Sequence, residues 1–154
     1  MVLAENLKNE NIITSLKSTS RWELIEELMD IAVANNAIAE DVSPVIKKAL
    51  IDREKSMSTG IGNGVAIPHC TTNKIEEILI MMATSKKGID FDAIDNHPVK
   101  IIILLIVPKN KLTQHIKTLA NIAKLMSNSQ LREKILSLKD PEAILTELQK
   151  FEKK

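Results

Sequence analysis

This chain of 154 residues has one cysteine, few aromatic residues and almost no excess of either charge. The single cysteine, Cys70, excludes a disulfide within the chain and fits a reducing compartment. Tyrosine is absent, and one tryptophan and two phenylalanines provide no aromatic platform for stacking single-stranded nucleic acid. The formal net charge of +1 gives no electrostatic footprint for nucleic acid or for a membrane surface. These shortages argue against nucleic-acid binding.

Long hydrophobic runs are missing as well. The longest apolar run, Ile101–Val107, is far shorter than the ~20 residues that a membrane-spanning helix needs. The first ten residues carry Glu5, Lys8 and Glu10 and contain no apolar core, which is unlike a secretory signal. We therefore expect a soluble, cytoplasmic protein without membrane insertion.

Capping signals predict where the helices begin. Ser20 with Glu23 forms a capping box, and Ser43-Pro44 and Asp140-Pro141 each place a capping residue before proline. The apolar stripe of the second helix includes Val45, and in the long third helix Ile116 lies beside the inward face. Expected helices run from Ser20 to Asn35, Ser43 to Lys55, Leu112 to Met126, Leu131 to Leu138 and onward from Asp140.

Short apolar and β-branched runs predict the strands between these helices. Two of them, Ile78–Thr84 and Val99–Val107, are apolar throughout, as strands buried on both faces are. The others are Asn11–Leu16 and Val65–Ile67, the second of which we expect Pro68 to stop. No Pro/Gly/Ser-rich linker or internal repeat divides the chain, so residues 1–154 are predicted to form a single α/β domain with helices on both faces of a sheet.

Residues 58–64, with the sequence STGIGNG, hold three of the four glycines. We interpret them as a backbone-exposed loop in which glycine lets N–H groups converge on an anion, with hydroxyl donors beside them. A tight turn is the alternative use of the same glycines, and the loop lacks both the GK[ST] and the GxGxxG patterns of nucleotide-binding folds. The predicted phosphate-binding residues are Ser58, Thr59, Gly60, Ile61, Gly62, Asn63 and Gly64.

A histidine, a second histidine and an arginine can complete a phosphoryl site around this loop. His69 follows it, Arg53 ends the preceding helix and offers a delocalised cation, and His115 lies in the first turn of the long helix. Such a site works by positioning and charge stabilisation and needs no metal. The neutral imidazole of His69, with an ordinary pKa of ~6.5, is the expected nucleophile, its other ring nitrogen bonded to a carbonyl or carboxylate.

Two alternatives use the same region of the chain. His69, Cys70, His97 and His115 are all potential zinc ligands, but no CxxC or HxxxH spacing supports a metal site. Cys70 is also a potential nucleophile activated by His69, although adjacent residues rarely form the hydrogen bond that this requires. His97, between Asn96 and Pro98, is expected to be structural or exposed to solvent.

The stretch Glu54–Cys70 (EKSMSTGIGNGVAIPHC) resembles the signature of the enzyme IIA domains of the fructose/mannitol class of the bacterial sugar phosphotransferase system. The matching positions are Glu54, Ile61-Gly62, Val65–His69 and the small residue Cys70, where glycine is commoner. The resemblance continues through residues 88–108 (GIDFDAIDNHPVKIIILLIVP) and the helix of His115, so it covers nearly the whole chain. The segment FDAIDNHPV is more similar to the stand-alone nitrogen-regulatory branch than to the sugar-specific domains.

This resemblance implies a phosphotransferase with a mixed β-sheet flanked by helices, and no cofactor or metal. It implies that His69 accepts the phosphoryl group through a ring nitrogen, and that His115 and Arg53 are the second histidine and the arginine of the site. The implied donor is the phosphohistidine form of HPr or of its nitrogen-branch relative. The downstream partner is a regulated kinase or transporter in the nitrogen-regulatory reading, or a IIB domain in the sugar-uptake alternative.

Overall fold

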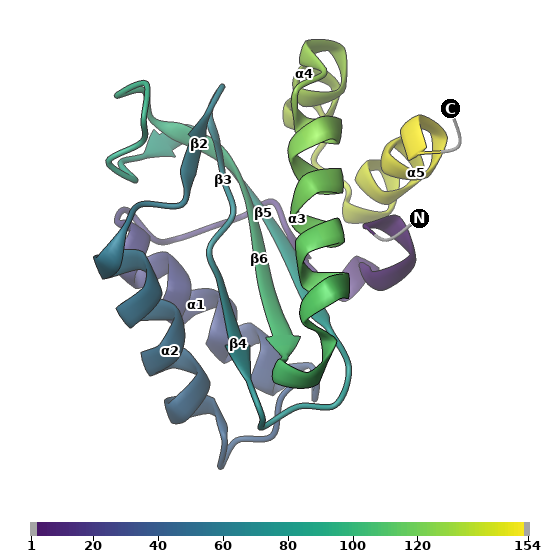
Figure 1. The fold of residues 1–154 in the computed structure, drawn as a ribbon. Coiled ribbons are helices and arrows are strands. Elements are labelled where there is room, and N and C mark those ends of the chain that lie inside the picture. The colour runs from purple at the N-terminus through teal and green to yellow at the C-terminus, as the bar shows by residue number, and fades with distance from the viewer. Residues whose placement is uncertain (1–2, 153–154) are drawn as a thin grey trace.

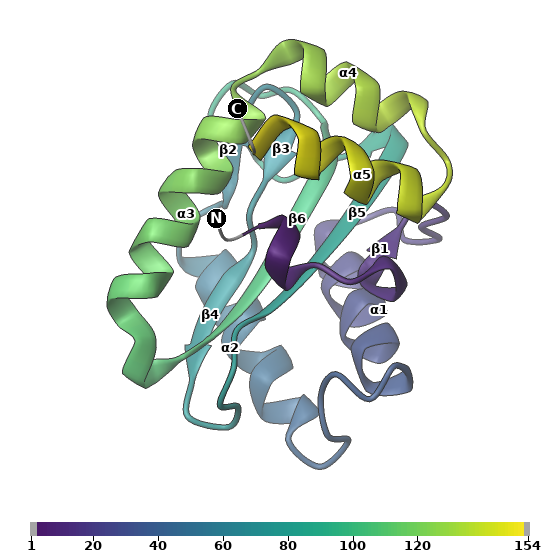
Figure 2. The same cartoon turned by 90° about the vertical axis from the view of Figure 1, so that its right-hand side faces the viewer.

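The computed structural model describes residues 3–152 as a β-sheet between two layers of helices (Figure 1). Helices α1 (Arg21–Ala34) and α2 (Ser43–Ser56) cover one face. The other face is covered by α3 (Leu112–Met126), α4 (Ser129–Ser137) and α5 (Pro141–Glu152), as the turned view in Figure 2 shows. Short 3-10 turns complete the chain: η1 (Ala4–Asn6), η2 (Asn9–Asn11) and η3 (Lys109–Lys111). The α/β class with helices on both faces is confirmed.

The sheet is mixed and runs in the order β1-β5-β6-β3-β2, with β4 also paired to β6. Strands β5 and β6 are antiparallel, as are β2 and β3, whereas β1 is parallel to β5 and both β3 and β4 are parallel to β6. The implied mixed sheet is therefore confirmed. The strands are β1 (Ile12–Ile13), β2 (Gly60–Gly62), β3 (Val65–Ala66), β4 (His69–Thr72), β5 (Leu79–Ile89) and β6 (Val99–Pro108).

The central strand β6 explains why its sequence is apolar throughout. Its side chains alternate between two cores because successive residues of a strand point to opposite faces. Ile102, Leu104 and Ile106 belong to the core shared with α1 and α2. Ile101, Ile103, Leu105 and Val107 belong to the core beneath α3, α4 and α5. Both faces of the sheet are covered, so no position of this strand is left for a polar residue.

The helix predictions were mostly accurate at the ends and less so at the faces. Ser20 caps α1 by accepting a hydrogen bond from the Glu23 N–H at 3.1 Å, and α3 begins and ends where predicted. Ser43 is the first residue of α2 rather than its cap, and Val42 takes the capping position without a side-chain bond. Val45 is 51% exposed and Ile116 is 62% exposed, so neither packs inward. An apolar stripe wider than the covered face leaves its outer members in solvent.

The stretch predicted as a glycine loop is a β-hairpin instead. Gly60 pairs with Ala66 and Gly62 with Val65, and the chain turns at Asn63 and Gly64, both with positive φ. A Cβ atom on Gly60 would lie 2.7 Å from the Cβ of Ala93, so glycine also permits a close approach of two segments. These glycines therefore do form a tight turn.

Strand β3 ends before Pro68, as predicted, but the chain pairs with β6 again from His69 onward. Strands β3 and β4 lie end to end along one edge of β6 in a single register, with Val65 opposite Ile101 and His69 opposite Leu105. Proline lacks an N–H but keeps its carbonyl, and the Leu105 N–H donates to the Pro68 oxygen at 2.9 Å. The N-terminal strand, by contrast, is shorter than predicted and consists of two residues, Ile12 and Ile13.

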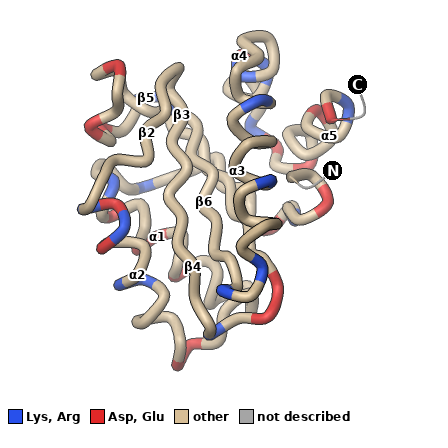
Figure 3. The backbone as a smooth tube through the Cα atoms, viewed as in Figure 1, with Lys and Arg blue, Asp and Glu red and all other residues tan. Residues whose placement is uncertain are grey.

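Charged residues of both signs are distributed over the helices and loops of the two layers (Figure 3). Their numbers nearly balance, which gives the net charge of +1. Between residues 3 and 152, no helix is both long enough and apolar enough to cross a bilayer.

Candidate active site

His69 begins β4 and points to the α3 side of the sheet. Residues alternate in direction along β3 and β4, and Ala66 and Cys70 belong to the core beneath α1 and α2. Val65 and Ile67 belong to the opposite core. His69 shares their direction, and its side chain is half-buried. The strand thus presents the imidazole toward the helix that carries His115.

A backbone carbonyl fixes the tautomer of His69. The ring nitrogen Nδ1 lies 2.7 Å from the carbonyl oxygen of Ile67. A carbonyl oxygen only accepts hydrogen bonds, so Nδ1 carries the proton in the neutral ring and Nε2 keeps its lone pair. The carbonyl partner expected for the second ring nitrogen is therefore that of Ile67. Sequence reasoning did not identify this residue, since a backbone group has no side-chain signal.

His115 lies against His69. The two ring centroids are 5.3 Å apart and the ring planes are inclined by 49°. His115 is only 8% exposed, and its Nδ1 atom is buried without a hydrogen-bond partner among the described residues. Burial, and then the neighbouring His69, lower the pKa of His115. The structure thus brings together the two histidines that the sequence predicted to share a site.

Arg53 completes the group from the last turn of α2, the helix that packs against β4. Its guanidinium donates to the carbonyl oxygen of Met57 at 2.8 Å. The pKa of His69 is lowered chiefly by burial and further by the positive charge of Arg53, while the hydrogen bond to Ile67 acts in the opposite direction. Both imidazoles are therefore neutral at neutral pH, the state that a nucleophilic nitrogen requires.

Several donors of residues 58–64 already have partners in the chain. The Thr59 N–H donates to Glu54 at 3.0 Å, the Gly60 N–H to the Ser58 hydroxyl oxygen at 3.0 Å, and the Asn63 N–H to Asp95 at 3.0 Å. The Ser58 hydroxyl in turn donates to the Phe91 carbonyl. The picture of an open loop with converging free N–H groups is wrong for these donors, because side chains and backbone of the α2 end and of residues 91–95 satisfy most of them. A phosphate-binding role for residues 58–64 stays a prediction.

The residues of the two alternative sites are placed differently. Cys70 is buried on the opposite face of the strand from His69, and burial raises the pKa of its thiol to about 12. The thiol is thus protonated at neutral pH and directed away from the imidazole. His97 is exposed, in the turn where its N–H donates to Asp95. Within residues 3–152, no three His, Cys, Asp or Glu side chains are grouped to hold a metal ion.

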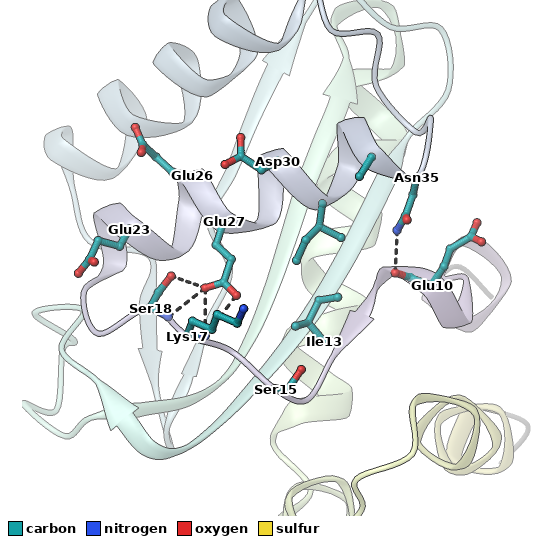
Figure 4. Close-up of a pocket in the computed structure, with 12 residues that line it drawn as sticks. Glu10, Ile13, Ser15, Lys17, Ser18, Glu23, Glu26, Glu27, Asp30 and Asn35 are labelled. Carbon is teal, nitrogen blue, oxygen red and sulfur yellow. Dashed lines mark hydrogen bonds between the residues drawn. The ribbon is translucent and has the colours of Figure 1, made fainter.

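A hollow of about 710 Å³ lies elsewhere, between α1 and residues 10–18 (Figure 4). Its border is acidic, with Glu23, Glu26 and Asp30 on α1. Glu27 points from the helix toward the facing segment and accepts a hydrogen bond from the Ser18 N–H at 2.9 Å. None of the predicted site residues lines this hollow, so the histidine pair is not part of it.

Known proteins match this chain over nearly its whole length. A family model described as "Phosphoenolpyruvate-dependent sugar phosphotransferase system, EIIA 2" matches residues 5–151. A nitrogen regulatory protein of Bradyrhizobium diazoefficiens is 32% identical over 148 residues, which cover 96% of this chain and 95% of that protein. The fructose-specific EIIA component of Haloferax volcanii is 32% identical over 120 residues, covering 78% of this chain and 77% of that protein.

A solved structure shows that the similarity extends to the fold. The crystal structure of the nitrogen regulatory protein IIA-Ntr from Neisseria meningitidis superposes with a TM-score of 0.87 at 27% identity, covering 96% of this chain and 99% of that one. The resemblance noted in residues 54–70 is thereby confirmed over nearly the full length. The chain belongs to the EIIA 2 family of the phosphoenolpyruvate-dependent sugar phosphotransferase system.

Proposed function

We propose that this chain is a cytoplasmic phosphocarrier of the nitrogen-regulatory type, which accepts a phosphoryl group on Nε2 of His69 and passes it to another protein. The observation that carries the proposal is the state of the His69 ring in a member of this family. Its Nδ1 proton is held by the Ile67 carbonyl, which leaves the Nε2 lone pair as the nucleophile. His115 lies against that ring, and the charge of Arg53 acts on it.

The proposed reaction exchanges one nitrogen–phosphorus bond for another. The Nε2 lone pair of His69 attacks the phosphorus of a phosphohistidine on an HPr-type donor while the donor's nitrogen–phosphorus bond breaks, its electron pair returning to the donor ring. Positive charge develops on the His69 ring as the new bond forms. The Ile67 carbonyl stabilises that charge because it accepts the Nδ1 proton. Arg53 and His115 are the proposed partners of the transferring oxygens.

The surface around the histidine pair supports a protein as the donor and acceptor. Large exposed hydrophobic side chains lie on the elements that carry the site, and such residues in soluble proteins mark interaction surfaces when they gather. Met57 follows α2, Ile61 is in β2, and Leu112 and Ile116 are in the first turns of α3.

A sugar-specific role is the second candidate, because the fructose-specific relative matches at the same 32% identity as the nitrogen regulatory one. In that role the phosphoryl group passes to a cysteine of a IIB domain. The regulatory role instead predicts a kinase or transporter that distinguishes the phosphorylated from the unphosphorylated protein, which differ by roughly −2 in charge. Transfer of label to a purified IIB domain favours the sugar-specific role.

The proposed acceptor is tested by incubating the chain with enzyme I, HPr and labelled phosphoenolpyruvate. We expect one phosphoryl group on the wild-type chain and none on the His69→Ala variant. His97→Ala is the matched control, because His97 is an exposed histidine outside the site, and it should be labelled like the wild type. His115→Ala and Arg53→Ala should be labelled more slowly. Labelling that persists in His69→Ala would overturn the assignment of the acceptor.

A further inference from the structure

Glu54 is a buried carboxylate next to Arg53 in sequence, and the proposed reaction does not use it. The residue is 1% exposed, near the end of α2. Its Oε2 atom accepts a hydrogen bond from the Thr59 N–H at 3.0 Å, and its Oε1 atom accepts one from the Thr59 hydroxyl at 2.5 Å. One side chain thus ties the end of the helix to the first residues of the β2–β3 hairpin.

Arg21 neutralises this buried charge. Its guanidinium donates to Oε2 of Glu54 at 3.2 Å and to the carbonyl oxygen of Phe91 at 2.7 Å. It also lies over the ring of Trp22, with 4.4 Å between the guanidinium carbon and the ring centroid. A carboxylate with three donors and a cation fixed on two sides tolerates burial, since its lone pairs and its charge are both satisfied.

A continuous series of hydrogen bonds leads from Glu54 to the ring of His69. Glu54 holds Thr59, whose carbonyl oxygen accepts the Ile67 N–H at 3.0 Å. The carbonyl of the same Ile67 accepts the Nδ1 proton of His69 at 2.7 Å. Each bond holds a residue whose other backbone group makes the next bond. The position of the last carbonyl therefore depends on the position of Thr59.

Glu54 also influences the position of the Arg53 side chain. The guanidinium of Arg53 is held by the carbonyl of Met57, which lies between Glu54 and Thr59 in the chain. Because Glu54 closes this short segment by binding Thr59, it restricts where the Met57 carbonyl lies. Two of the three proposed site residues, Arg53 and His69, are thus anchored to groups that Glu54 holds.

We propose that Glu54 is a positioning residue of the phosphoryl site, which acts through Thr59 and Ile67 to hold His69 in the tautomer with a free Nε2 and through the same segment to aim Arg53. Its effect on transfer rests on the proposed function, but its effect on the His69 ring does not. The carboxylate touches neither the imidazole nor the transferring group. In this role, the side chain of Glu54 must be long enough to bind Thr59, whereas its charge serves chiefly to pair with Arg21.

Two substitutions of Glu54 separate the effect of its side-chain length from the effect of its charge. Glu54→Asp keeps the negative charge for Arg21 but shortens the side chain by one methylene and withdraws it from Thr59. Glu54→Gln keeps the length and an amide oxygen for the Thr59 N–H, while its amide nitrogen can donate to the Thr59 hydroxyl. Ile144→Ala is the matched control for lost stability, because Ile144 is a buried residue of α5, in the core on the opposite face of the sheet from α2. All variants are studied at a temperature where they are folded.

The tautomer of His69 is read from nitrogen NMR shifts of isotopically labelled histidine in the unphosphorylated protein. We expect the wild type, Glu54→Gln and Ile144→Ala to show the single tautomer with the proton on Nδ1. Glu54→Asp should show a mixture with the Nε2-protonated form. Its phosphorylation by HPr should slow by about tenfold to a hundredfold, as misplacement of reacting groups does.

A folded Glu54→Asp variant with the wild-type tautomer would overturn the proposal, and so would an equal change in Ile144→Ala. If HPr fails to phosphorylate even the wild type, the proposed function is wrong, while the nitrogen shifts still decide the role of Glu54.

Discussion

Burial, the Ile67 carbonyl and the charge of Arg53 together set the pKa of the His69 ring, and thus the pH above which Nε2 is a nucleophile. Burial has the largest effect and lowers its pKa, the Ile67 carbonyl opposes this, and the charge of Arg53 lowers the pKa further. The net direction is downward from the ordinary value of 6.5. A lowered pKa keeps Nε2 unprotonated into mildly acidic conditions, so the site is ready over a wider pH range than a free histidine.

The corresponding prediction is an NMR titration of the unphosphorylated protein. We expect the midpoint of the His69 ring to lie below 6.5, and Arg53→Gln to raise that midpoint because it removes one of the two lowering influences. The titration is followed on the ring itself, so the donor protein's own ionisation does not enter. A wild-type midpoint at or above 6.5, or a downward shift in Arg53→Gln, would contradict this account of the site.

The helices and strands differ in how well their own residues predict them. Helix α3 was predicted to its two ends, because its periodicity and the proline before it are local features. Residues 58–64 and 69–72 were not, because the hairpin and strand β4 depend on pairing with distant segments: Gly60 packs on Ala93, and His69 pairs with Leu105. Glycine-rich composition indicates a special backbone, but it does not distinguish an open loop from a closely packed turn.

The packing of β2 yields a prediction at this scale. In Gly60→Ala the new Cβ would meet the Cβ and Cα of Ala93 at 2.7 and 2.9 Å, which forces the hairpin away from residues 91–95. We expect the free energy of unfolding to fall by about 1 to 3 kcal/mol, as is usual for overpacking. Urea denaturation measures it. The control is Ile61→Ala in the same strand, 44% exposed, which should change stability by less than about 0.5 kcal/mol. Equal stabilities of the two variants would refute the steric explanation.

At the scale of the whole molecule, the two imidazoles link the stability of the fold to pH. His69 on the sheet and His115 on α3 both have a lowered pKa, with burial as the first cause. In the unfolded chain each has the ordinary pKa of ~6.5. As the pH falls below that value, the unfolded chain binds protons that the folded chain does not. Acid therefore favours unfolding, and this contribution to stability is fully present only above the unfolded pKa.

We expect the free energy of unfolding to decrease as the pH is lowered from about 7 to 5, the range over which these histidines titrate. The double variant His69→Gln/His115→Gln should show a flatter dependence. Glu152, whose pKa is raised by burial, acts in the opposite direction. Comparing the two proteins cancels that contribution, since both retain Glu152. Urea denaturation at each pH provides the free energies, and equal slopes would show that the histidine pair is not the source.

The amino-acid sequence alone determined the class of the fold, the helix of His115 and the candidate acceptor His69. These follow from hydrophobic periodicity, from caps such as Ser20, and from a signature spaced along a few consecutive turns and strands. Only the tertiary structure decided which groups surround that acceptor. It bonded the Nδ1 proton of His69 to the Ile67 carbonyl, paired donors of residues 58–64 with Glu54 and Asp95, and brought Arg21 to Glu54 across 33 positions of the chain. Periodicity and capping depend on neighbours a few residues away, whereas hydrogen bonds between distant segments depend on how the layers pack.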